Sequence, residues 1–286
     1  MSNPRLSVVC VTFNSADCLP DFLESLEKLP ADEFEAIFVD NNSTDSTVEL
    51  IQKRSRTSLV IQNEQNLGWS AANNQGIKAS KGKFIFLANP DIWFEPEDLP
   101  KLAGFLDEHP EFAAAALQLL NPDGGLQPSC RRLPTPADMV FQMTGLAFLF
   151  PKSFLNRWKM PEFDHQCLRE VEQPMASALL VRRAAFEEID GLDERFFVFF
   201  GDVDFCRRLK KAGLRIAFVP EAKVFHQRGG STSKMGAAFY FSSHFGFFRY
   251  LWTWSGSLQK VLLLSLWPLV FLTAVGRAAF ASIFRR

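Results

Sequence analysis

The sequence is poor in tyrosine, in paired cysteines and in excess charge of either sign. It has 2 Tyr against 30 Phe, a bias that indicates a large apolar core, an apolar surface, or both. Its 5 Cys are scattered without a Cys-x-x-Cys pair, which is typical of a reduced compartment with cysteines as small core residues. A net charge of −1 predicts no nucleic-acid partner. No signal-peptide pattern precedes the first apolar run, so we expect a cytoplasmic location.

Two glycine-rich phosphate-binding motifs are also missing. No Gly-x-Gly-x-x-Gly follows the first apolar run, which argues against a dinucleotide fingerprint, and no Gly-Lys-Ser/Thr P-loop occurs. A phosphate-bearing ligand would then need a metal ion rather than a glycine cradle.

Short apolar runs alternate with helix-like stretches in the first third of the chain. Buried strands are expected at 7–11, 36–39, 59–61 and 84–88, with helices at 19–28, 46–54 and 70–80. Because each strand is followed by a helix, we expect an α/β fold with a mostly parallel sheet and helices on both faces.

The middle of the chain is less regular. An Asn-Pro-Asp-Gly-Gly run at 121–125 predicts a hairpin turn. Two further strands are expected at 178–181 and 216–219. A helix at about 203–212 lies between them and would end at Gly213.

Polar residues follow all four of the early strands. They are Thr12 to Ser15, Asp40 to Asp45, Asn66 to Trp69, and Asn89 to Asp91. Each loop alone is explained by ordinary turn and capping chemistry. Four such loops at one edge of a parallel sheet favour a ligand crevice. Asp91 is a suitable hard oxygen ligand for Mg²⁺ or Mn²⁺.

Two carboxylates, Asp202 and Asp204, lie in an aromatic run that begins at Phe196. A carboxylate in apolar surroundings has a raised pKa, which suits a general base. The alternative is a short acidic helix start with Asp202 as its N-cap.

His226 follows the expected strand at 216–219 and precedes Arg228 and a Gly-Gly pair. It is a candidate metal ligand, and a structural histidine in an apolar neighbourhood is the alternative. The glycines would let this segment fold over a bound phosphate, with Arg228 facing a diphosphate.

The C-terminal tail is apolar and aromatic. No charged residue lies between Lys260 and Arg277, a stretch shorter than the roughly 20 residues of a spanning helix, and Pro268 lies in its middle. Three interpretations stay open: a monotopic or re-entrant membrane helix, a short tilted span, or a helix in an oligomer interface. The aromatic content and basic flanks favour membrane contact.

Six segments together resemble the inverting nucleotide-sugar glycosyltransferases of family two, which have the GT-A fold, and especially their rhamnosyltransferase-like branch. The segments are VCVTFN (9–14), FVDNNSTD (38–45), NLGWSAANNQGI (66–77), FLANPD (86–91), DGGLQPSCRR (123–132) and GLDERFF to DVDFC (191–206), followed by His226. They cover roughly residues 6–232 in the family's order.

The resemblance implies roles for individual residues. Nucleotide contacts are expected from Thr12, Asn14, Asp40, Asn42, Asn74 and Asn89, with Asp40 accepting from the pyrimidine ring. Asp91 and His226 would hold the divalent metal, Mg²⁺ or Mn²⁺, and Asp202 would be the catalytic base. Contacts to a phosphate or to the acceptor are expected from Arg131, Arg228 and Trp69.

This chain departs from the family pattern at two positions. Asn89 replaces the first Asp of an Asp-x-Asp metal motif, a change that the rhamnosyltransferase-like branch often shows. Gly201 stands where a Glu usually precedes the base, which puts the handling of the acceptor in doubt.

These observations predict a GT-A (Rossmann-like) domain at 1–232, with a nucleotide-sugar half at 1–115 and an acceptor half at 116–232. An apolar helical tail, membrane-associated, is expected at 233–286. The expected function is metal-dependent, inverting transfer of a sugar, best guessed as rhamnose, from a dTDP- or UDP-linked donor. The expected acceptor is a lipid-linked saccharide at the inner face of a bacterial plasma membrane, in cell-surface polysaccharide synthesis. A homo-oligomer, another nucleotide-binding transferase and a non-catalytic membrane-bound partner of the same fold stay open.

Overall fold

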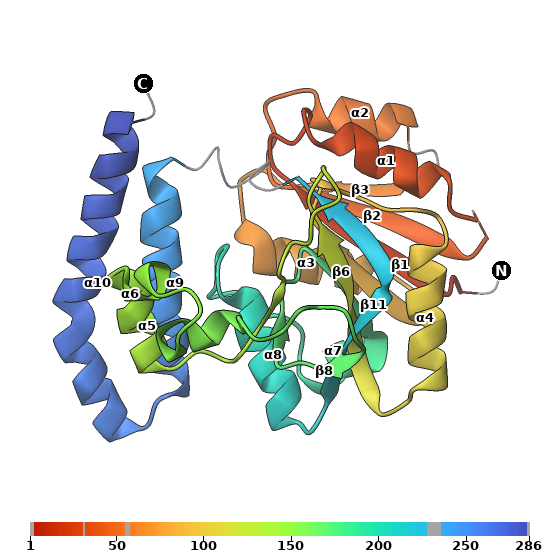
Figure 1. Ribbon diagram of the computed structural model, residues 1–286. Coiled ribbons are helices and arrows are strands. Elements are labelled where there is room, and N and C mark those ends of the chain that lie inside the picture. Colours follow the sequence, from red (N-terminus) through yellow and green to blue (C-terminus); the bar gives the residue numbers. More distant parts are fainter. Residues whose placement is uncertain (1–2, 31, 55–57, 228–235, 285–286) are drawn as a thin grey trace.

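A computed structural model describes residues 3–30, 32–54, 58–227 and 236–284 (Figure 1). Its strands are β1 (Leu6–Thr12), β2 (Phe34–Asp40), β3 (Ser58–Gln62), β4 (Phe84–Ala88), β5 (Ile92–Trp93), β6 (Phe112–Leu120), β7 (Cys130–Arg131), β8 (Arg169–Glu170), β9 (Gln173–Pro174), β10 (Ala178–Arg182) and β11 (Arg215–His226). Its helices are α1 (Leu19–Glu27), α2 (Thr47–Arg54), α3 (Gly68–Ala79), α4 (Asp98–Glu108), α5 (Pro136–Met143), α6 (Leu146–Leu149), the 3₁₀ helix η1 (Phe154–Lys159), α7 (Arg183–Glu188), α8 (Gly201–Lys211), α9 (Ala237–Trp254) and α10 (Ser257–Phe284).

A mixed sheet forms the centre of the molecule. Its strand order is β3-β2-β1-β4-β10-β6-β11-β5, with β8 paired to β11. The first four strands in this order are parallel, as predicted, whereas β10 runs antiparallel between β4 and β6. The parallel pairing brings the carboxyl ends of β1, β2, β3 and β4 to one edge, where ligands bind in open α/β sheets.

Helices cover both faces of the sheet because alternate strand residues point to opposite sides. On one face Val8 of β1 shares a core with Phe22 of α1 and with α4. On the other face the adjacent Val9 shares a core with Phe186 of α7 and Phe205 of α8. The predicted α/β architecture is therefore confirmed.

Two predicted elements differ in length. The strand expected at 216–219 extends to His226, because a register shift between Val219 and Lys223 lets β11 continue along β6. The helix expected at about 203–212 starts at Gly201. The turn at 121–125 is present, with the N–H of Asn121 donating to the carbonyl of Gly125.

A third apolar cluster joins the tail to the rest of the fold. Its buried members include Phe196 and Phe200 before α8, and Phe247 and Tyr250 of α9. Burying such a side chain stabilises the fold by roughly 1.5–3 kcal/mol. Figure 1 shows α9 lying between α10 and α8.

Polar contacts connect α9 to α8 directly. The indole Nε1–H of Trp254 donates to Asp204 Oδ1 at 2.8 Å, and Arg208 Nε donates to Asp204 Oδ2 at 2.7 Å. Arg207 also donates to the hydroxyl of Tyr250 at 3.0 Å. Asp204 is 1% exposed, so these contacts compensate the cost of burying its charge.

The last helix, α10, is longer than the uncharged stretch of the sequence. It runs for 28 residues and includes Lys260, Pro268 and Arg277, which corresponds to about 42 Å at the rise of an α-helix. The uncharged stretch thus underestimates the helix, and by length and composition α10 is long and apolar enough to cross a membrane. Its exposed large apolar side chains are Leu258, Val261, Leu262, Leu264, Trp267, Phe271, Leu272, Val275 and Phe280.

Candidate active site

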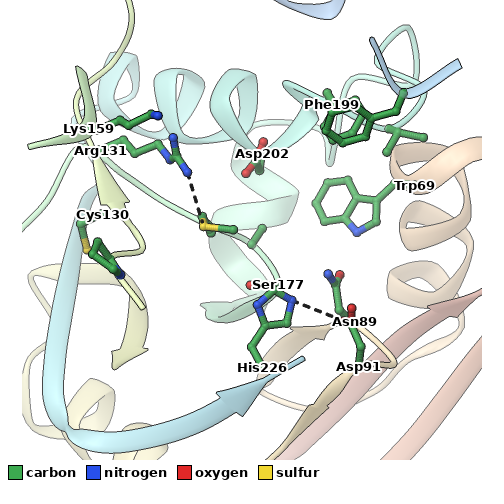
Figure 2. Close-up of a pocket in the computed structure, with 15 residues that line it drawn as sticks. Trp69, Asn89, Asp91, Cys130, Arg131, Lys159, Ser177, Phe199, Asp202 and His226 are labelled. Carbon is green, nitrogen blue, oxygen red and sulfur yellow. Dashed lines mark hydrogen bonds and ion pairs between the residues drawn. The ribbon is translucent and has the colours of Figure 1, made fainter. Parts of the chain in front are cut away.

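One cavity of about 670 Å³ opens beyond the carboxyl end of β4 (Figure 2). It is lined by residues from the sheet edge, from β7 and η1, and from the loops and helices between 175 and 239. The lining residues are Trp69, Asn89, Asp91, Pro128, Cys130, Arg131, Lys159, Met175, Ala176, Ser177, Val198, Phe199, Asp202, His226 and Phe239. Six of the residues proposed from the sequence alone therefore share one pocket: Trp69, Asn89, Asp91, Arg131, Asp202 and His226.

Asp91 and His226 face each other at the floor of this pocket. Asp91 Oδ1 lies 3.4 Å from His226 Nε2. The short strand β5 pairs with the end of β11, with His226 opposite Ile92, and the N–H of Gln227 donates to the carbonyl of Asp91 at 2.9 Å. Backbone pairing thus sets the separation of two side chains that are far apart in sequence.

Gln127 fixes the orientation of the His226 ring. His226 Nδ1 lies 2.6 Å from Gln127 Oε1, and the amide nitrogen of Gln127 donates to Asn121 Oδ1 at 2.9 Å. Because the amide oxygen only accepts, Nδ1 donates to Gln127, and Nε2 is the ring nitrogen that faces Asp91. A ring held in this way is the usual arrangement of a metal-binding histidine.

The chemistry of this pair fits a divalent metal ion. Asp91 is 4% exposed, and within the described ranges its Oδ1 has no hydrogen-bond partner, although it lies within ion-pair distance of His226 Nε2. A buried carboxylate oxygen in that state calls for a cation. No group of three or more His, Cys, Asp or Glu residues gathers anywhere in the described chain. Mg²⁺ and Mn²⁺ accept such sparse protein ligation when phosphate oxygens complete the shell.

Asp202 lies on the opposite side of the same pocket (Figure 2). It sits in the first turn of α8, where its Oδ1 accepts from the N–H of Val203 at 2.9 Å. The cap position is Phe200, in a left-handed conformation with φ +70°, so the alternative of Asp202 as N-cap is wrong. Burial raises the pKa of Asp202, while the N–H of Val203 and the charge of Arg131 oppose that rise. Such a carboxylate is suited to accept a proton near neutral pH.

Close packing explains why position 201 is a glycine. A Cβ at this position would lie 2.4 Å from Ser70 Oγ and 3.4 Å from the ring of Trp69. The start of α3 is equally close to the aromatic run: Gly68 has φ +84°, and a Cβ there would lie 2.4 Å from the carbonyl of Phe197. The two helix starts therefore meet without room for a side chain, and a Glu at position 201 does not fit this arrangement.

The aromatic run only partly forms a wall of the pocket. Val198 and Phe199 line it, but Phe196 and Phe200 are buried in the third apolar cluster. Phe197 is 48% exposed. The part of the pocket wall that this run contributes therefore consists of Val198 and Phe199.

Four of the six residues expected to contact the nucleotide lie at the ends of β1 and β2, outside the pocket lining, whereas Asn89 lines the pocket and Asn74 lies on α3. Thr12 Oγ1 donates to Asp40 Oδ1 at 2.8 Å, and the N–H and hydroxyl of Ser43 both donate to the carboxylate of Asp40. Asn14 Oδ1 accepts from the N–H of Thr44 at 2.8 Å. Asn42 is exposed, in a left-handed conformation. Because β1 separates β2 from β4, this network lies one strand away from Asp91.

Asn74 has a different setting from the other expected nucleotide contacts. Its side-chain amide donates to the carbonyl of Leu192 and to Glu194 Oε1, both at 2.9 Å. Its oxygen accepts from the N–H of Leu192. The amide of Asn74 therefore holds the 191–194 loop against α3. Arg228 lies outside the described residues.

Sequence reasoning missed Gln127 and Lys159. Gln127 is fully buried and lies in the DGGLQPSCRR segment, but no local pattern distinguishes it from a turn residue. Its role depends on a partner 99 positions away. Lys159 ends η1 in a segment without a recognisable motif.

A family comparison settles the class of this protein. The model described as Glycosyl transferase family 2 matches residues 7–190. The chain belongs to glycosyl transferase family 2. An N-acetylglucosaminyl-diphospho-decaprenol L-rhamnosyltransferase of Mycobacterium tuberculosis is 31% identical over 255 residues, which cover 84% of this chain and 81% of that protein. The predicted family and its rhamnosyltransferase-like branch are confirmed.

Solved structures show the same fold at low identity. A mannosyltransferase of Pyrobaculum calidifontis in complex with GDP-Man and Mn²⁺ has a TM-score of 0.60 at 16% identity, covering 99% of this chain and 76% of that one. The 1–349 fragment of S. aureus TarS in complex with UDP-GlcNAc has a TM-score of 0.58 at 20% identity, covering 91% and 70%. These neighbours confirm the GT-A architecture.

Proposed function

We propose that this family 2 glycosyltransferase transfers a sugar from a nucleoside diphosphate to a saccharide on a lipid carrier, with inversion at the anomeric carbon. Rhamnose from a dTDP-linked donor is the first choice, and a UDP-linked donor the second. The observation that carries the proposal is the Asp91–His226 pair facing Asp202 across a single pocket.

The donor would lie across the ends of β1, β2 and β4. Asp40, held by Thr12 and Ser43, would accept from the base of the nucleotide, because a carboxylate has more acceptor sites than these partners use. Asn14, Asn42, Asn74 and Asn89 stay proposed nucleotide contacts. The diphosphate would then reach the pocket floor, where Asp91 and His226 would hold a divalent cation.

The reaction needs one proton acceptor and one leaving group. The acceptor hydroxyl attacks the anomeric carbon, its proton passes to Asp202, and the bond from that carbon to the diphosphate oxygen breaks. Attack on the side opposite the leaving diphosphate inverts the configuration in one step. A bound Mg²⁺ or Mn²⁺ would offset the charge that develops on the departing diphosphate. Trp69 and Arg131 line the space where the two sugars would meet.

The lipid-linked acceptor has two sources of support. The M. tuberculosis relative is named for a diphospho-decaprenol acceptor. In addition, α10 leaves a row of apolar side chains exposed, and Phe148, Phe150 and Phe154 on the neighbouring segment are more than half exposed. We propose that these surfaces contact the inner face of a bacterial plasma membrane, in polysaccharide synthesis. A second copy of the chain covering α10 is the alternative.

Gly201 is the sequence feature that favours a non-catalytic partner of the same fold. The contact of α8 with Trp69 and Ser70 gives this glycine a structural role that does not involve activity. Asp91, Asp202 and His226 share the pocket, which supports a working enzyme.

Thermal unfolding with Mn²⁺ and a panel of nucleotide sugars tests the proposal. A ligand at 100 times its Kd stabilises the native state by about 2.7 kcal/mol. We expect the largest rise in Tm with dTDP-rhamnose, ahead of UDP-N-acetylglucosamine and GDP-mannose. An unchanged Tm with every nucleotide sugar of the panel would contradict the proposal. A product with retained anomeric configuration would contradict the inverting mechanism.

A further inference from the structure

Two basic side chains line the pocket beside the proposed base. Arg131 comes from β7 and Lys159 from the end of η1, and Figure 2 shows both on the side of Asp202, away from Asp91 and His226. The proposed donor diphosphate would meet its counter-charge, a divalent cation, at the Asp91–His226 end. The pair formed by Arg131 and Lys159 is therefore positioned for a second anion, on the acceptor side of the pocket.

Arg131 is fixed by its surroundings. Its guanidinium lies over the ring of Trp158, 5.1 Å from the centroid, and its Nη2 lies 3.8 Å from the sulfur of Met175. The backbone of Arg131 pairs with Gln173 of β9. A guanidinium held in this way presents its donors in a set direction, and forked donors match the oxygens of a phosphate group.

Lys159 is connected to the apolar surface of the protein by a short piece of chain. The segment before it carries four large apolar side chains with high exposure: Phe148 85%, Leu149 66%, Phe150 53% and Phe154 73%. Phe154 is the first residue of η1 and Lys159 is the last. One six-residue helix thus joins a surface suited to a lipid chain with a cation in the pocket.

We propose that Arg131 and Lys159 bind the diphosphate of a lipid-diphosphate-linked acceptor. The lipid chain would leave toward residues 148–154, and the saccharide would present its hydroxyl to Asp202. This inference rests on the proposed function and specifies the acceptor class: a prenyl diphosphate sugar rather than a neutral glycolipid.

The test compares two acceptors that share a sugar and differ in charge. N-Acetylglucosamine would be offered on a short prenyl diphosphate and, separately, as its uncharged octyl glycoside. Lys159→Met should lower kcat/KM for the diphosphate acceptor about 10- to 100-fold, the range for losing a hydrogen bond to a charged group. It should leave kcat/KM for the octyl glycoside and the KM for the donor unchanged. Lys53→Met, at an exposed lysine on α2 outside both the pocket and the 148–154 segment, is the matched control and should change neither.

Two outcomes of this comparison would overturn the inference. Equal losses on both acceptors would place Lys159 in a general structural role. A higher donor KM in Lys159→Met would assign the cations to the donor diphosphate instead.

A binding measurement separates this inference from the proposed function. Farnesyl diphosphate would be titrated calorimetrically into wild-type protein and Lys159→Met, without metal or donor. At least tenfold weaker binding to Lys159→Met is expected, and equal affinity would overturn the subsite whatever the enzyme transfers. Wild-type protein that transfers to neither acceptor while still binding farnesyl diphosphate through Lys159 would contradict the proposed function but not the subsite.

Discussion

The donor side and the acceptor side of this site are built in different ways. On the donor side, Thr12, Asp40 and Ser43 satisfy one another at the ends of two neighbouring parallel strands. On the acceptor side, the pocket draws on α3, β7, η1, α8 and α9. The first arrangement depends on local pairing, whereas the second depends on how distant elements pack. On the acceptor side, some changes should therefore lower activity without lowering stability, and others should lower stability. The following variants test this difference.

The largest effect is expected from Asp202→Asn. This change removes the proposed proton acceptor and should lower kcat by about 10²- to 10⁴-fold, the contribution typical of a general base. Donor affinity should stay at the wild-type value, because Asp202 lies opposite the Asp91–His226 pair. Asp32→Asn, the same change at an exposed site, is the control for kcat and donor affinity. Turnover close to wild type in Asp202→Asn would remove Asp202 from the mechanism.

The raised pKa of Asp202 predicts a pH dependence of both activity and stability. The base works only when ionised, so kcat/KM should fall as pH drops, with the acid limb above the ordinary aspartate pKa of about 3.9. The folded state binds this proton more tightly than the unfolded state. Stability contributed by Asp202 is thus lost as pH rises from its unfolded to its folded pKa. Asp202→Asn should therefore not lower Tm at pH 7, and a Tm below that of wild type would show that the carboxylate is stabilising.

A smaller effect, on stability, is expected from Trp254→Phe. The change removes the hydrogen bond to buried Asp204 and should cost about 1.5–3 kcal/mol, the range for a hydrogen bond to a charged group. Urea unfolding measures this loss. Trp252→Phe is the control, since Trp252 packs against Phe248 without contacting Asp204. Equal stability of the two variants would mean that α9 is not held to α8 by this contact.

Gly201→Ala should have the smallest of these effects. Its Cβ would press on Ser70 Oγ, and overpacking of this kind costs about 1–3 kcal/mol. Adding Ser70→Ala should restore part of that loss, a coupling that a double-mutant cycle measures. Gly104→Ala on α4, where a Cβ meets nothing within 4 Å, should instead stabilise the protein. Additive effects of the Gly201 and Ser70 changes would show that the two residues do not contact.

The same contrast explains what could be predicted from the sequence. The strands β1 to β4 and their polar ends were predictable because apolar runs, turns and helices alternate over short distances. Asp91 and Asp202 were proposed from motifs, and both line the pocket. The hydrogen bond from Trp254 to Asp204 spans 50 positions, and that from His226 to Gln127 spans 99. No periodicity or propensity records such contacts, because they arise only when distant elements pack.

The C-terminal tail is a second case in which the sequence does not reveal how elements pack. Its composition predicted an apolar helix, and the structure contains two helices, α9 and α10, of which α9 packs on α8. Composition does not distinguish an apolar helix that faces the protein from one that faces outward. In the aromatic run at 196–200, likewise, composition does not show that Phe196 and Phe200 pack on the tail rather than on the pocket.

In the proposed mechanism, Asp91 and His226 bind the metal and the donor diphosphate, whereas Asp202 accepts the proton of the acceptor. The central claim is this division of roles. Calorimetric titration of dTDP with and without Mn²⁺ into Asp91→Asn and Asp202→Asn measures this division with the same chemical change at both sites. We predict that Asp202→Asn keeps the Mn²⁺-dependent gain in dTDP affinity and that Asp91→Asn loses it. An equal gain in both variants, or a loss confined to Asp202→Asn, would contradict the account.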